Sequence, residues 1–450
     1  MMPQTLIICR TIVTMDAARP IVRDGALLVR DNRIERVLNQ DERARLGPFD
    51  GEIVDAGPMT AIPGFVQTHI HLCQTLFRGL ADDLELLDWL RTRIFPFEHA
   101  HSPSSMYASA RIGLAELIRS GTTTIMDMGS VHHEEEVFRA VEESGIRAFV
   151  GKAMMDVNEI FPPLCESTAD ALATTVRQAE AWHRASGDRI RYAVAPRFVL
   201  SCSEALLKES HAITRSIPGI LFHTHAAENR REMESVRARC HGGNVEFFDR
   251  LGILDSSSCL AHCIWLDDQE MDLLASRHAK VLHCPSSNLK LGSGIARVPE
   301  MLRKGIAVSL GADGAPCNNT LDMFQEMRHA ALIQKPLHGA TSMGARTVFE
   351  LATLGGAAAL GLENEVGSLE PGKKADIVLL DLGQSWNPLI ETEESVYGSC
   401  VYSCTPSNVR SVMVDGRWLY RDRVLIAIDE QDALRVARRE ARALLERISA

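Results

Sequence analysis

Eight short β-rich runs, separated by longer segments of helical or irregular pattern, constrain the fold of this chain most strongly. Eight strands alternating with helices over roughly 250 residues are typical of a (β/α)8 barrel. The alternative is an open doubly wound sheet, but the chain lacks the GxGxxG turn with which such sheets bind a phosphate. We therefore predict an α/β fold built on a TIM-type (β/α)8 barrel. The runs span residues 62–67, 122–127, 147–152, 190–195, 219–224, 258–261, 279–282 and 306–310.

Further strand-like runs lie at both ends of the chain, outside the barrel pattern. Runs that precede the barrel are joined by turn signals, and two late runs are separated by Asp415-Gly416, a good hairpin turn. We predict a β-sandwich domain made of residues 1–58 and 365–427, beside a catalytic barrel at 59–364 and a C-terminal helix at 428–450. Candidate barrel helices span residues 103–120, 133–144, 169–185, 203–216, 230–251 and 267–277.

The composition is that of an ordinary globular protein, with 450 residues, 46% hydrophobic and 24% charged. A net charge of -11 argues against a nucleic acid or an anionic membrane as partner. No apolar run approaches the roughly 18–20 residues of a membrane span, and the N-terminus lacks a signal-peptide layout. Eleven cysteines without a CxxC pair favour a reduced, cytoplasmic protein. No motif bears on assembly, for which a homodimer is our expectation.

Metal-ligating side chains collect where the predicted strands end. His69 and His71 are two residues apart, so they point to the same face of a strand and can bind one cation together. Barrel enzymes carry their sites at the carboxyl ends of the strands. A single histidine there is more often structural, but five strand ends with His or Asp, in a chain with 16 His, predict a metal site. The later strand ends carry His223, His225, Glu228, His262, His283 and Asp313.

We predict that His69, His71, His225 and Asp313 bind one divalent ion, and either Zn(II) or Fe(II) suits this set. His223 shares a strand face with His225 and competes with it. We prefer His225 because it precedes Glu228 by three residues, which places an acid close to the ion. Glu228 would then transfer protons, and His262 would polarise the substrate or orient a water. A bound metal lowers the pKa of its water, so that hydroxide becomes available as a nucleophile.

Several motifs resemble the amidohydrolase superfamily, specifically its cytosine-deaminase and chlorohydrolase branch. They are PGFVQTHIH, HTHAAE, AHC, HCPSSN, GADG and, near the end, GSLEPGKKADIVLLDL. The resemblance covers nearly the whole chain. It implies a barrel with a flanking β-sandwich, one divalent metal, and hydrolytic removal of an amino or similar group from a nitrogen heterocycle. By motif match it assigns His69, His71, His225 and Asp313 as ligands, and Glu228 and His262 as catalytic. We predict a catalytic role for Asp313 as well.

The motifs of the subfamilies disagree about the heterocycle. QTLFRGLADDLELLDWL and GADGAPCNNTLDMFQEMRHAALIQK resemble methylthioadenosine/adenosylhomocysteine deaminases and triazine hydrolases, whereas RAFVGKAMMDVN and APRFVLSCSEALL resemble guanine deaminases. Adenosine-type enzymes usually have a PHS-like motif where this chain has Pro196-Arg197-Phe198. Glu98 resembles their ribose-binding carboxylate, but guanine deaminases have a similar Glu.

We predict that Gln74, Glu98, Arg197 and Phe198 bind the substrate. Arg197 offers only donors, which suits a ring carbonyl, unless it pairs with Glu98 and never meets the substrate. Gln74 can donate and accept, and Phe198 can stack on a base. These residues favour a guanine-like ring. A 5′-modified adenosine deaminase or an s-triazine hydrolase is the alternative. Trp89, Phe95 and Phe97 either cap the pocket or pack in the core.

Two other classes of function stay open at this point. A non-catalytic scaffold of the same superfamily should have lost metal ligands, and none is missing. A binuclear cyclic amidase would need a carboxylated Lys at the fourth strand end, where this chain has Arg197. Metal stoichiometry separates the three classes: one ion per chain for a deaminase, two for a cyclic amidase and none for a scaffold.

Overall fold

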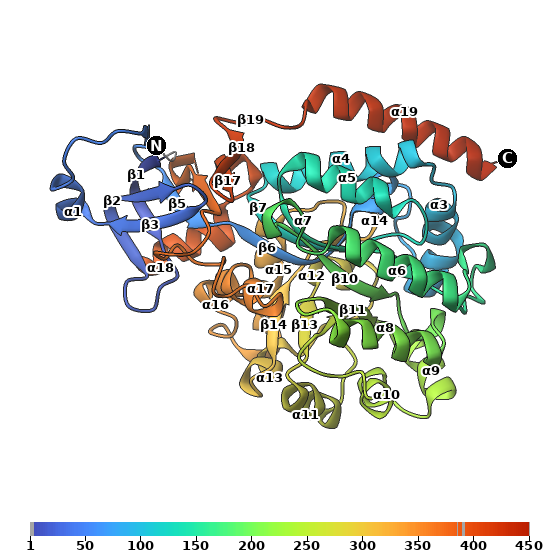
Figure 1. The fold of residues 1–450 in the computed structure, drawn as a ribbon. Coiled ribbons are helices and arrows are strands. Elements are labelled where there is room, and N and C mark those ends of the chain that lie inside the picture. Colours follow the sequence, from blue (N-terminus) through green and yellow to red (C-terminus); the bar gives the residue numbers. More distant parts are fainter. Residues whose placement is uncertain (1–3, 385, 389–391, 450) are drawn as a thin grey trace.

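The computed structural model describes residues 4–384, 386–388 and 392–449. The remaining residues fall within the predicted β domain and C-terminal helix and lie outside the described part. The chain forms a barrel with a second sheet at one side (Figure 1). Among the described residues, no helix has the length and apolar character needed to cross a membrane.

A parallel sheet that closes on itself confirms the predicted barrel. Its order is β14-β13-β12-β11-β10-β8-β7-β6-β15, and the short β9 (Ala153–Met154) pairs with β10. β15 (Asp313–Gly314) follows β14 along the chain and pairs with β6, which joins the last strand to the first. The eight principal strands are β6 (Phe65–His71), β7 (Thr122–Met128), β8 (Arg147–Gly151), β10 (Ile190–Pro196), β11 (Leu221–Ala226), β12 (Ser258–His262), β13 (Lys280–His283) and β14 (Ala307–Leu310).

The first barrel strand begins later than the predicted run 62–67. Ile62 belongs to β5 (Thr60–Pro63), which pairs in the second sheet, and β6 starts only at Phe65. The chain passes from one sheet to the other at Gly64, where a Cβ atom would lie 2.1 Å from the side chain of Thr123. Only glycine fits so close an approach. His69 and His71 therefore lie within β6 and not after it, and still on one face.

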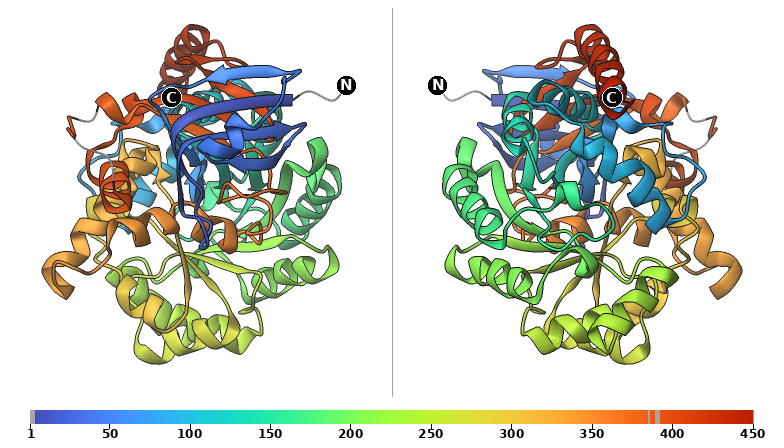
Figure 2. Two further views of the ribbon diagram at one scale, coloured as in Figure 1. Left: turned by 90° about the vertical axis from the view of Figure 1, so that its left-hand side faces the viewer. Right: turned by 90° about the vertical axis from the view of Figure 1, so that its right-hand side faces the viewer.

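Helices surround the barrel (Figure 2). The prediction of a single helix over 230–251 was wrong. This stretch forms two helices, α9 (Arg230–Cys240) and α10 (Asn244–Leu251). His241, with φ of +54°, ends the first in a left-handed conformation. The other principal barrel helices are α4 (Pro103–Arg119), α5 (Glu134–Ser144), α6 (Thr168–Trp182), α8 (Glu204–Ser216), α11 (Asp268–Arg277), α12 (Pro285–Lys290), α13 (Val298–Arg303), α15 (Met323–His338), α16 (Ala345–Leu351) and α17 (Leu354–Ala359).

Short helical segments follow several strand ends. After β6 come η1 (Leu72–Phe77), α2 (Leu86–Trp89), a π-helical turn η2 (Leu90–Ile94) and α3 (Phe95–His99). π-Helical turns are rare and occur often at functional sites. The others are η3 (Pro162–Leu164), α7 (Ala185–Asp188), η4 (Val199–Ser201), α14 (Ala315–Asn318), η5 (Leu382–Gln384), α18 (Glu393–Gly398), the π-helical η6 (Ser399–Ser403) and η7 (Pro406–Asn408).

The second sheet draws strands from both ends of the chain, as predicted for the flanking β structure. Its order is β19-β18-β17-β16-β5-β1-β2-β3, with β4 beside β1. Seen from its own side, it covers one end of the barrel (Figure 2). The strands are β1 (Gln4–Val13), β2 (Ile21–Arg30), β3 (Arg33–Leu38), β4 (Glu52–Asp55), β5, β16 (Ile377–Leu380), β17 (Val409–Val414), β18 (Arg417–Arg421) and β19 (Val424–Leu425), and the short α1 (Gln40–Ala44) follows β3.

A buried ion pair joins the two sheets. Arg147, at the start of β8, donates from Nε and Nη2 to the two carboxylate oxygens of Asp376 at 3.2 and 3.1 Å. α19 (Glu430–Ser449) runs along α4, where Arg111 contacts Asp432 at 2.7 Å (Figure 1). The domain boundaries at 58/59, 364/365 and 427/428 stay a prediction. β5, which follows the first of these boundaries, pairs with β1 and β16 of the second sheet.

Candidate active site

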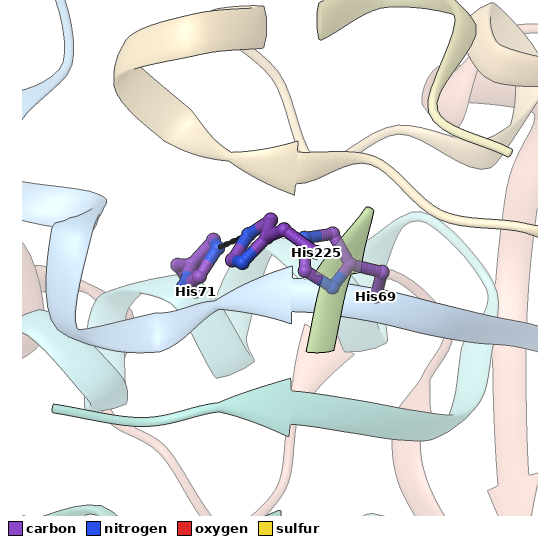
Figure 3. A group of neighbouring side chains, drawn as sticks. All are labelled: His69, His71 and His225. Carbon is purple, nitrogen blue, oxygen red and sulfur yellow. Dashed lines mark hydrogen bonds between the residues drawn. The ribbon is translucent and has the colours of Figure 1, made fainter. Parts of the chain in front are cut away.

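Four side chains from three strands converge at the carboxyl end of the barrel. His71 Nε2 lies 3.3 Å from His225 Nε2, and Asp313 Oδ1 lies 3.3 Å from His71 Nε2 and 3.4 Å from His69 Nε2. Figure 3 shows the three imidazoles, with His69 and His71 on β6. These are the four residues predicted from the sequence to share an ion. The structure brings all four together.

The hydrogen bonds of His71 and His225 determine which nitrogens face the centre. Nδ1 of His71 lies 2.8 Å from the carbonyl oxygen of Met128, and Nδ1 of His225 lies 2.8 Å from that of Arg197. A carbonyl only accepts, so both Nδ1 atoms carry the proton and both Nε2 atoms present lone pairs. Burial lowers the pKa of His71 to about 3, and burial holds the pKa of His225 well below its usual value. The lone pairs of the two Nε2 atoms therefore face each other.

A divalent cation fits this arrangement of donors. Nε2 of His69 is also buried and has no hydrogen-bond partner among the described residues. Three neutral imidazoles and one carboxylate, each oriented through its other atom by a protein group, are a donor set typical of a cation site. The cluster can thus hold one metal ion.

His223 and His225 share a strand face, but only His225 points to the centre. Nε2 of His223 lies 2.8 Å from Nδ1 of His69, and its other ring nitrogen is buried without a partner among the described atoms. His223 therefore contacts the back of the His69 ring. From the sequence, either histidine could be the metal ligand on this strand. Their ring contacts favour His225.

The predicted acid–base residues lie beside the cluster. Nε2 of His262 is 3.5 Å from Glu228 Oε2 and 3.8 Å from Asp313 Oδ2. Burial, followed by the charges of Asp313 and Glu232, raises the pKa of Glu228 well above its usual value. A carboxyl group with a raised pKa can carry a proton near neutral pH, as acid–base catalysis requires.

Three further residues hold these groups in place, and the sequence reasoning did not single them out. Ser287 donates its hydroxyl to Asp313 Oδ2 at 2.6 Å, and Asn288 Oδ1 lies 2.8 Å from His262 Nδ1. Glu232 accepts the backbone N–H of Glu228 at 2.8 Å. Ser287 and Asn288 belong to the HCPSSN motif, from which both could have been identified as site residues.

Backbone strain also occurs at the same strand ends. Ala227, His262 and Asp313 have φ of +51°, +72° and +63°, in the left-handed region that side chains other than glycine rarely adopt. Each such residue costs about 1–3 kcal/mol and persists only where the surroundings impose it. At Gly311 the chain passes so close to β6 that a Cβ would lie 2.6 Å from the His69 carbonyl oxygen. This close approach lies just before Asp313, which pairs with Ile70 of β6.

Glu98 binds two of the other predicted substrate residues. Arg197 donates from Nη1 and Nη2 to the two oxygens of Glu98 at 2.6 and 3.0 Å, and Gln74 Nε2 donates to Glu98 Oε1 at 2.8 Å. Burial alone would lower the pKa of Arg197, but the charge of Glu98 raises it above its ordinary value. Arg197 therefore has the carboxylate partner that was the alternative to a ring carbonyl.

A small cavity opens beside the cluster. It has about 430 Å³ of empty space. Gln74, Arg197 and Phe198 line it, whereas Glu98 lies behind them and does not. Apolar side chains form one wall of this cavity. That wall comes from the segment after β6 and from the loop after α12, and its residues are Leu86, Trp89, Leu90 and Leu291.

The buried pair of Glu98 and Arg197 leads to a prediction about stability. Glu98→Ala should lower the free energy of unfolding by about 3–5 kcal/mol, because it leaves a buried guanidinium unpaired. Urea denaturation measures this. Arg297→Ala, which removes an exposed pair with Asp268 at 2.9 Å, is the control and should leave the midpoint unchanged. Equal midpoints for the two variants would mean that Arg197 finds another partner.

Comparison with known proteins assigns the family. The profile of the amidohydrolase family matches residues 60–419 of the chain. This chain belongs to the amidohydrolase family. A 5′-deoxyadenosine deaminase of Methanothermobacter thermautotrophicus is 41% identical to this amidohydrolase, over 92% of this chain and 94% of that protein. A 5-methylthioadenosine/S-adenosylhomocysteine deaminase of Moorella thermoacetica is 38% identical, over 89% and 90%.

Solved structures of deaminases superpose on nearly the whole of this amidohydrolase. An adenosine deaminase from Xanthomonas campestris with bound zinc has a TM-score of 0.90 and 29% identity, covering 99% of both chains. The Escherichia coli guanine deaminase has a TM-score of 0.83 and 27% identity, covering 93% of this chain and 99% of the other. The family resemblance and the prediction of an enzyme are confirmed. The preference for guanine is not supported, because the relatives of higher identity are adenosine-type enzymes.

Proposed function

We propose that this amidohydrolase removes the 6-amino group of a 5′-modified adenosine as ammonia. The observation that supports this most directly is the 41% identity to a 5′-deoxyadenosine deaminase over 92% of the chain. Preference for a guanine-like ring requires an Arg197 that is free to meet a ring carbonyl. Both terminal nitrogens of Arg197 instead donate to Glu98. The alternative of a 5′-modified adenosine deaminase therefore replaces guanine as the proposal.

We assign His69, His71, His225 and Asp313 to one divalent cation, with Zn(II) as the first choice. Imidazole and carboxylate ligands suit Zn(II), and Fe(II) would accept the same set. Such an ion, when bound, supplies a water nucleophile with a lowered pKa and neutralises developing charge. This assignment rests on the nitrogens of the three imidazoles and the carboxylate of Asp313, which face one centre.

The protein groups supply the proton transfers. An oxygen from water forms a bond to C6 of the purine, and Glu228 passes the proton of that water to the neighbouring ring nitrogen. His262, oriented by Asn288, faces Glu228 and Asp313 and stabilises charge on the attacking oxygen. The C6–N bond then breaks, and the amino group takes up the second proton of the former water from the C6 hydroxyl and leaves as ammonia. The products are a 6-oxopurine nucleoside and ammonia.

The substrate preference can be measured directly. We expect kcat/KM for 5′-deoxyadenosine or methylthioadenosine to exceed that for guanine by about 100-fold or more, since a site complementary to one purine leaves polar groups unpaired on the other. An ammonia-release assay with purified enzyme, with adenosine, guanine and an aminotriazine in the same panel, gives the ranking. Guanine as the best substrate would overturn this proposal and leave the metal assignment untouched.

Two further expectations remain predictions. They are the cytoplasmic location, drawn from cysteine usage, and the homodimer. Neither affects the proposed chemistry, because every residue assigned above belongs to one chain.

A further inference from the structure

Trp89 has a buried donor without a partner in the cavity next to the cluster. Its side chain lines the cavity and is 4% exposed, and its indole Nε1 makes no hydrogen bond with any described residue. Buried indole N–H groups usually find an acceptor. Trp265 is an example, because its Nε1 donates to the carbonyl oxygen of Ser293 at 2.8 Å. A buried donor without an acceptor costs about 1–3 kcal/mol, which a ligand that supplies the acceptor would recover.

The same cavity also holds an acceptor without a partner. Oε1 of Gln74 is buried and unpaired among the described atoms, while its amide nitrogen donates to Glu98. Gln74 is 1% exposed. The cavity therefore presents one free donor and one free acceptor beside the side chains of Leu86 and Leu90. Such a wall matches a ligand that carries hydroxyl groups on an otherwise apolar body.

The indole N–H of Trp89 is separate from the groups that act on the purine ring. The ring end of the site is formed by Glu228, His262 and Asp313, and no ring contact or hydrogen bond joins Trp89 to any of them. Glu98, which resembles a ribose-binding carboxylate, already has both oxygens engaged by Arg197 and Gln74. A carboxylate accepts but does not donate, so a sugar oxygen that accepts a hydrogen bond needs its donor from another residue.

We propose that the indole N–H of Trp89 donates a hydrogen bond to a sugar oxygen of the substrate and so selects nucleosides over free bases. This rests on the proposed function, because it takes an adenosine as the occupant. In such a nucleoside the sugar is attached at N9, on the side of the purine away from C6, and its oxygens accept hydrogen bonds. Trp89 lies on the apolar wall of the cavity, so its N–H can meet the sugar of a nucleoside whose purine lies beside the cluster.

Trp89→Phe tests the proposal, since it keeps an aromatic ring in the wall and removes only the N–H. We expect kcat/KM for 5′-deoxyadenosine to fall by about 5- to 20-fold, mainly through KM, as for a lost hydrogen bond that leaves a group unpaired. For 9-methyladenine, which has no sugar oxygen, the change should stay below about twofold. The 2′-deoxy and 3′-deoxy analogues identify the accepting oxygen, because the effect of Trp89→Phe disappears when that oxygen is absent.

Trp418→Phe is the matched control. Nε1 of Trp418 is likewise buried without a partner among the described residues, but it lies on β18 of the flanking sheet. Trp418→Phe should leave kcat/KM unchanged for every substrate. Thermal unfolding of both variants shows whether each folds normally. An equal loss on 5′-deoxyadenosine and 9-methyladenine, or no loss on either, would overturn the role of Trp89 while leaving the proposed function standing. A wild-type enzyme that deaminates no adenosine nucleoside would instead overturn the proposed function, and this inference with it.

Discussion

Glu228→Gln is expected to lower kcat by about 100-fold or more while bound metal and folding stay unchanged. Glutamine has the same shape but cannot take up and release a proton. Glu228 is buried, and its pKa is raised well above the usual value by burial and then by the charges of Asp313 and Glu232. The site therefore already accommodates an uncharged side chain, so the amide should cost little stability. Steady-state kinetics and metal analysis on the same preparation measure the two effects.

The control for that variant is Glu234→Gln, an exposed position on α9, the helix that begins two residues after Glu228. It should retain full activity, since no proposed role falls on it. Normal turnover in Glu228→Gln would remove Glu228 from the mechanism. If Glu228→Gln loses the metal and His225→Ala keeps it, then ligand and proton shuttle are exchanged in our assignment.

Asp313→Ala and His71→Ala are expected to abolish both bound metal and activity. Each removes a side chain whose donor atom faces the common centre, with Asp313 Oδ1 3.3 Å from His71 Nε2. Losing a group that only orients a ligand typically costs about 10- to 100-fold in metal affinity, so losing a ligand should cost more. Elemental analysis of the purified variants should find far less metal than in the wild type, in which we expect one ion per chain.

Two histidine variants serve as controls for this experiment. His223→Ala should keep its metal, because the Nε2 atom of His223 contacts His69 and does not face the centre. His211→Ala removes a buried histidine that lies 3.1 Å from Asp255, and it should keep metal and activity. Full metal content with normal turnover in His71→Ala or Asp313→Ala would rule out the proposed ligand set. Loss of metal in His223→Ala would favour His223 over His225.

Strand periodicity predicted much of the site. Residues two apart on a strand share a face, so His69 and His71 were identified together, and the strand ends carrying His225, His262 and Asp313 could be aligned. The barrel followed from eight runs with intervening helices, since parallel neighbours need such crossovers. The same periodicity could not separate His223 from His225, because both lie on one face.

The sequence by itself therefore determined the barrel, its flanking β structure and the residue types gathered at the strand ends. These follow from local periodicity and from motifs, both of which can be identified in the sequence without knowing which residues meet in space. Only the tertiary structure decided which of these groups are already engaged. Glu98 and Arg197 are 99 positions apart, and their pairing depends on how the segment after β6 folds over the fourth strand end. The free N–H of Trp89 has the same origin, because a missing partner depends on every neighbour in space and on no pattern in the sequence.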